Sequence, residues 1–109
     1  MNIADAEGRY YRALQKLSDL VTRRNQALFD LQSMSADAVT PIPSAGTVLA
    51  FNVERSRSLV KRISRLNSQI ERAMASVNKY AERTGQNPVE WKHSRSDEDG
   101  SEAGAPSTA

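Results

Sequence analysis

The feature that most constrains this chain is an apolar repeat of seven residues, which occurs in two separate stretches. In the first stretch, over residues 3–35, apolar side chains recur in three columns. These columns occupy heptad positions a, d and e, which share one face of an α-helix. The alternation that a half-buried strand requires does not fit. We therefore predict a helix over about 3–35, with Asn2 as its N-cap and Asp5 in its first turn.

The second stretch continues the same three columns over about 46–84. Ser44 or Thr47 is expected to cap its start, just after Pro43. Gly85 suits the position after the last helical residue, and Pro88 follows shortly beyond it. A second helix over about 46–84 is predicted, with a short extension over 85–91.

The residues between the two stretches, 36–45, are predicted to form a turn rather than a domain linker. If the chain reverses there, apolar positions of the two stretches face each other, with Leu17 opposite Ile63. The one polar break in the first seam, Arg24, then falls near Asn52 and Ser56. A polar layer of this kind commonly sets the register of a coiled coil. The sequence thus predicts an all-α fold, an antiparallel coiled-coil hairpin.

Each apolar stripe is wider than the a/d seam of a two-stranded coil requires. A second copy would cover the extra column, so we expect a homodimer or higher oligomer built as a four-helix bundle. The alternative is a monomeric hairpin whose exposed edge binds a different protein. The residues expected at the oligomer interface are Leu14, Leu17, Val21, Leu28, Leu59, Val60, Ile63, Leu66, Ile70 and Val77.

Residues 1–91 are predicted to form one helical hairpin domain, followed by a polar, acidic and disordered tail over 92–109. The tail lacks the apolar side chains that ordering requires. No apolar run approaches the roughly 20 residues that span a bilayer, and the N-terminal residues lack the apolar core of a signal peptide. Since the chain also lacks Cys, a cytoplasmic location without a membrane span is the expectation.

Charge is distributed unevenly along the chain. Residues 47–84 contain eight basic and three acidic side chains, whereas residues 85–109 contain two basic and five acidic ones. On a helix, the basic side chains of the second stretch lie away from the apolar stripe. A solvated helix face is the simplest interpretation, and the alternatives are a nucleic-acid backbone or an acidic protein. The candidate binding face consists of Arg55, Lys61, Arg62, Arg65 and Arg72.

A few apolar side chains fall outside the seams. Those near the turn either pack together or form a docking tip for a partner; they are Phe29, Val39, Ile42 and Phe51. Trp91, the only tryptophan, either fastens the chain to the open end of the bundle or anchors a partner.

Catalysis is not expected, because the single histidine, His93, lies in the polar tail without an acid–base partner. We expect no cofactor and no metal. The function predicted from the sequence is a non-enzymatic protein–protein interaction module that acts through the apolar stripe, as an adaptor, a small regulator or a structural subunit. The alternative is a nucleic-acid-binding accessory protein that uses the basic face.

Overall fold

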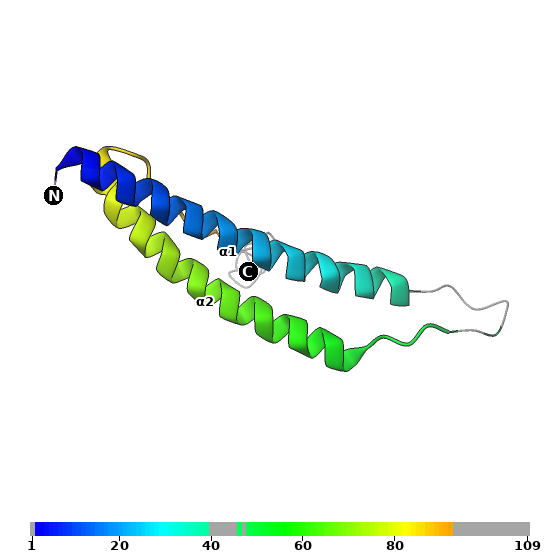
Figure 1. The fold of residues 1–109 in the computed structure, drawn as a ribbon. Coiled ribbons are helices and arrows are strands. Elements are labelled where there is room, and N and C mark those ends of the chain that lie inside the picture. Colours follow the sequence, from blue (N-terminus) through cyan, green and yellow to red (C-terminus); the bar gives the residue numbers. More distant parts are fainter. Residues whose placement is uncertain (1, 40–45, 47, 93–109) are drawn as a thin grey trace, which may run out of the picture.

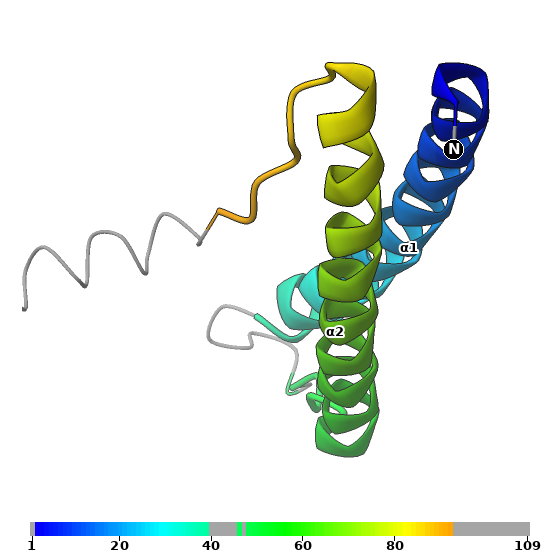
Figure 2. The same cartoon turned by 90° about the vertical axis from the view of Figure 1, so that its left-hand side faces the viewer.

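The computed structural model describes residues 2–39, 46 and 48–92. These residues form two α-helices, α1 (Ile3–Ala38) and α2 (Val53–Thr84), which pack against each other as an antiparallel hairpin (Figure 1). Viewed from the side, α1 runs obliquely across α2 (Figure 2). The predicted all-α hairpin is confirmed. Ile42 and the predicted tail, apart from Lys92, lie outside the described residues.

Both helices begin at an asparagine. The Asn2 Oδ1 accepts a hydrogen bond of 2.8 Å from the Asp5 N–H, as an N-cap does, so the predicted start of α1 is confirmed. At the second start, Asn52 Oδ1 accepts from the Arg55 N–H at 2.9 Å. The prediction that α2 starts near residue 46 with Ser44 or Thr47 as its cap was wrong. The heptad pattern places Asn52 in the d column of the seam. In the structure its side chain instead accepts a hydrogen bond from the first turn of α2, where the N–H groups have no partner within the helix.

The end of α2 follows the prediction. Gly85 adopts a left-handed conformation with φ 72° and ψ 17°, which a residue with a side chain adopts only with strain. The Gln86 N–H then donates to the Ala81 carbonyl at 2.9 Å, closing the last turn. This geometry directs the following residues back along the hairpin.

The register of the two helices differs from the predicted one by roughly one heptad. Leu17 shares its surroundings with Ile70 and Met74 rather than with Ile63, and Arg9 of α1 meets Tyr80 of α2. The shift follows from the late start of α2, which lengthens the connection. A slip of one heptad returns the same columns to the same face, so periodicity does not distinguish the two registers.

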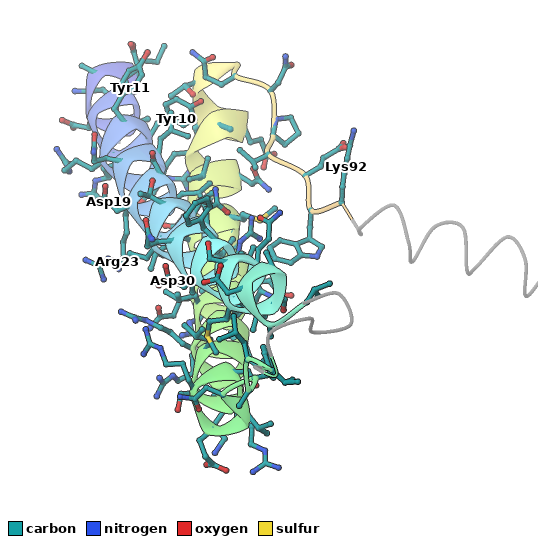
Figure 3. All side chains as sticks on the ribbon, turned by 90° about the vertical axis from the view of Figure 1, so that its right-hand side faces the viewer. Tyr10, Tyr11, Asp19, Arg23, Asp30 and Lys92 are labelled. Carbon is teal, nitrogen blue, oxygen red and sulfur yellow. The ribbon has the colours of Figure 1, made fainter. Side chains whose placement is uncertain are left out.

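The apolar core is concentrated in the half of the hairpin near the chain ends. Figure 3 shows Tyr10 between the two helices there, whereas Tyr11 lies on the outer side of α1. The buried members of the cluster are Tyr10, Leu17, Leu20, Leu66, Ile70, Ala73, Met74, Val77 and Ala81. Among the described residues of the half near the connection, only Ala27 and Leu59 are buried. The a and d columns therefore form most of the core, Met74 and Ala81 of the e column complete it, and burial declines toward the connection.

Residues 85–92 lie against the hairpin and cover part of the e column. The Asn78 Nδ2 donates to the Val89 carbonyl at 3.0 Å, and the Val89 N–H donates to Asn78 Oδ1 at 2.7 Å. Val89 packs on the core cluster, and Trp91 lines a shallow groove with Val21 and Met74. Cover that we expected from a second copy thus comes, in this half, from the chain itself.

Candidate interaction surfaces

The candidate sites of this chain are surfaces of the two helices and of the residues that connect them. Neither helix is long and apolar enough to cross a membrane. Among the same residues, no three His, Asp or Glu side chains gather closely enough to hold a metal ion. Two features of the surface are candidate interaction sites. One is a group of exposed apolar side chains near the connection, and the other is a concentration of basic side chains along both helices.

The residues predicted at an oligomer interface fall into three groups. Five are buried between the helices of a single chain: Leu17, Leu59, Leu66, Ile70 and Val77. Three are half-buried: Leu14, Val21 and Ile63. Leu28 and Val60 expose 41% and 53% of their surface. A partner therefore has direct access to only this last pair, both of which belong to the e column.

Leu28 and Val60 belong to a larger apolar area, which we call the loop-end surface. It consists of Leu28, Phe29, Val39, Val48, Leu49, Phe51, Val53 and Val60, all of them exposed. Large apolar side chains that gather at one end of a small protein mark an interaction site more often than scattered ones do. The sequence indicated Leu28 and Val60 as interface residues, and it indicated a docking tip that includes Phe29, Val39 and Phe51. The candidate residues predicted from the sequence did not include Val48, Leu49 and Val53.

A polar atom without a partner lies in the same e column. Asn67 follows Val60 in that column by seven residues, and its Oδ1 is buried without a hydrogen bond from any described residue. In the observed register Asn67, rather than Asn52 or Ser56, lies nearly level with Arg24, whose guanidinium instead donates to Asn25 Oδ1. Buried acceptors are nearly always satisfied in folded proteins, so Asn67 Oδ1 is an exception. In this column Asn67 stands between the exposed Val60 and the buried Met74, where the covered half gives way to the open half.

The five basic residues predicted as a binding face, Arg55, Lys61, Arg62, Arg65 and Arg72, are all exposed. The ion pair recorded between described residues joins Arg57 and Glu54 at 2.9 Å, outside this set. The structure adds two basic residues that the sequence did not indicate. Arg23 lines one groove with Arg62 and Arg65, and Lys16 lines the adjoining groove with Arg72. Their position depends on the packing of α1 on α2, so spacing within one helix did not reveal it.

At the other end of the hairpin, Tyr80 lies among three cations. A hydrogen bond from Arg9 lowers the pKa of the Tyr80 hydroxyl below its ordinary value. Burial opposes this shift, and the charges of Lys79, Arg9 and Arg83 lower the pKa further. The Lys79 Nζ lies 5.5 Å from the centre of the Tyr80 ring, and the Arg83 Cζ lies 6.0 Å from it. Arg9 of α1 thus lies beside Tyr80 of α2 near the chain ends.

We expect Arg9→Ala to raise the pKa of Tyr80, because the phenolate loses its hydrogen-bond donor and one nearby charge. Because the folded pKa is depressed, this contribution to stability is present above the unfolded pKa and is lost as pH falls through the folded value. Phenolate absorbance during alkaline titration measures the shift, and Tyr80→Phe identifies which transition belongs to this residue. Arg12→Ala is the control, and an equal shift in that variant would contradict the assignment to Arg9.

No family model, curated protein or solved structure matches this chain. Its function is therefore inferred from its own surfaces.

Proposed function

We propose that this protein is a non-enzymatic helical interaction module that pairs with a second copy through the loop-end surface. The observation that carries the proposal is the uneven cover of the e column. Near the chain ends, Val89 and Trp91 lie over it, whereas Leu28, Val53 and Val60 near the connection remain exposed. A paired hairpin would act as an adaptor, a small regulator or a structural subunit of an assembly.

A second copy suits this surface for two physical reasons. The loop-end surface includes residues of both helices, with Leu28 from α1 and Val60 from α2. Two hairpins related by a twofold axis therefore bring their loop-end surfaces together. The product is a four-helix arrangement, in which a third apolar column becomes buried and coiled-coil packing extends to four helices. A two-helix hairpin also gains stability from such pairing, because its own core is small.

The test compares two pairs of exposed apolar residues. We expect Leu28→Asp combined with Val60→Asp to abolish the dimer, because two carboxylates per chain would become buried at the interface. Ile3→Asp combined with Tyr11→Asp is the matched control, since both residues are exposed but lie at the other end of α1. Analytical ultracentrifugation measures the mass, and circular dichroism verifies the helix content.

A wild-type protein that sediments as a monomer at every concentration would contradict the proposal. So would a Leu28/Val60 variant that remains as dimeric as the control.

Nucleic-acid binding is a second candidate function, and it is favoured by the exposed basic face of α2. Arg62 and Arg65 have no carboxylate partner among the described residues, so their charges are free to neutralise phosphates. Arg62→Glu with Arg65→Glu is expected to abolish binding to a duplex DNA at low salt, as measured by fluorescence anisotropy. Binding that is insensitive to salt would exclude a phosphate-backbone interaction.

A further inference from the structure

We propose that α1 and α2 together build one phosphate-binding groove for the backbone of duplex nucleic acid. This proposal rests on the second candidate function and extends it, because it assigns two residues of α1 to a site that otherwise belongs to α2. The basic residues of the groove are Lys16 and Arg23 from α1 and Arg62, Arg65 and Arg72 from α2.

The groove consists of two adjoining hollows between the helices. One is lined by Arg23 with Arg62 and Arg65, and the other by Lys16 with Arg72. Both hollows include Arg23 and Gln69, so they form one continuous channel. Figure 3 shows Arg23 on the side of the hairpin opposite Lys92, so the channel lies away from the face that residues 85–92 cover.

The lining of the channel is uniform in charge. Besides the five cations it contains the polar side chains of Gln69 and Ser76, and none of the described residues that line it carries a carboxylate. Ala13, Leu20, Leu66 and Ala73 form its floor. Like charges packed at this density repel one another, and an anionic ligand relieves that repulsion. Guanidinium groups pair with phosphate oxygens in a bidentate manner, which favours phosphate over a simple anion.

The spacing along the helices suits a nucleic-acid backbone. Lys16 and Arg23 are seven residues apart, which corresponds to about 10 Å along α1 at 1.5 Å per residue. A duplex rises about 3.4 Å per base pair along its axis, so a duplex that lies along α1 passes both side chains within about three base pairs.

A duplex fits this groove better than a single strand or a membrane does. Single-strand sites use aromatic side chains on which bases stack, and no aromatic residue lines either hollow. Interfacial membrane binding needs apolar side chains that enter the acyl region beside the charges. The exposed phenylalanines of this protein, Phe29 and Phe51, instead belong to the loop-end surface.

The test measures binding of the full-length chain to a duplex DNA by fluorescence anisotropy over a range of salt concentrations. We expect Lys16→Ala with Arg23→Ala to weaken binding at least tenfold. The slope of log affinity against log salt should fall by about 2, because roughly 0.9 counterions are released per phosphate contact. Alanine favours helix, so the helix content should be unchanged.

The matched control is Arg57→Ala with Lys92→Ala, which removes the same charge from residues outside the groove. It should leave the salt slope unchanged. If the Lys16/Arg23 variant behaves like this control while Arg62→Glu with Arg65→Glu abolishes binding, the two-helix groove is refuted and the face of α2 remains. If the wild-type chain fails to bind the duplex at low salt, both proposals fail.

Two further ligands test whether the groove prefers a duplex to a single strand or to a membrane. A single strand of the same length is expected to bind more weakly than the duplex, as are vesicles of phosphatidylserine and phosphatidylcholine. Tighter binding to either of them would overturn the assignment to duplex nucleic acid.

Discussion

Replacing Val77 by Asp is expected to unfold the hairpin. Val77 is 0% exposed and belongs to the main core cluster, so the carboxylate would be buried without a partner. The cost of burying such a charge is several kcal/mol, roughly as large as the whole stability of a small domain. Far-ultraviolet circular dichroism during heating should show the loss of helix and of a cooperative transition.

Ala75→Asp provides the control for Val77→Asp. Ala75 is exposed on the same helix, so the substitution adds the same charge without entering the core, and it loses more helix propensity than Val77→Asp does. Its unfolding temperature should remain close to that of the wild type. A Val77→Asp protein that melts cooperatively at the wild-type temperature would show that this position is not part of the core.

Ending the chain at Gln86 is expected to produce the second largest loss of stability. The shortened protein lacks Val89 and Trp91, and Asn78 loses both of its hydrogen bonds to Val89. Two hydrogen bonds contribute about 1–3 kcal/mol, and the packing of Val89 on the core adds to that. Chemical denaturation should therefore have a lower midpoint, and the newly exposed e column should promote self-association.

A chain that ends at Lys92 is the control for this truncation, because it retains the contacts of Asn78 and Trp91. Asn78→Ala in the full-length chain should reproduce part of the loss and shift Trp91 fluorescence toward that of an exposed indole. If all three proteins unfold at the same denaturant concentration, residues 85–92 do not stabilise the hairpin.

Local sequence signals predicted much of the fold. Asn2 starts α1 and Gly85 ends α2, because each satisfies backbone groups within one turn of its own position. Tyr10 and Val77 are buried as their a columns predict. These features depend on contacts within a helix or on the period of the helix, and both can be inferred from the order of the residues.

Caps and helical periodicity did not predict where α2 starts or how the two helices pair. The heptad columns continue upstream of Asn52, through Leu49, although the helix does not. Apolar periodicity shows which face of a segment is suited to burial, but not whether the segment is helical. The cap that Asn52 provides settled the boundary, and the boundary set the length of the connection.

The candidate sites were also predictable only in part. The basic character of Arg62, Arg65 and Arg72 was visible in the sequence, but the participation of Lys16 and Arg23 was not. Residues on two helices become neighbours only through the register, and a slip of one heptad changes every such neighbour. Likewise, the sequence showed that the e column is not needed for a seam between two helices, but it did not show what covers that column.

The order of the residues by itself determined that this chain forms two long amphipathic helices whose apolar faces consist of the a, d and e columns. That outcome follows from the helical period and from caps, which act over a few residues. The tertiary structure alone decided the register, the cover that Val89 and Trp91 provide, and the place where apolar surface remains exposed. These depend on contacts between distant segments, for which the heptad repeat offers several nearly equivalent pairings.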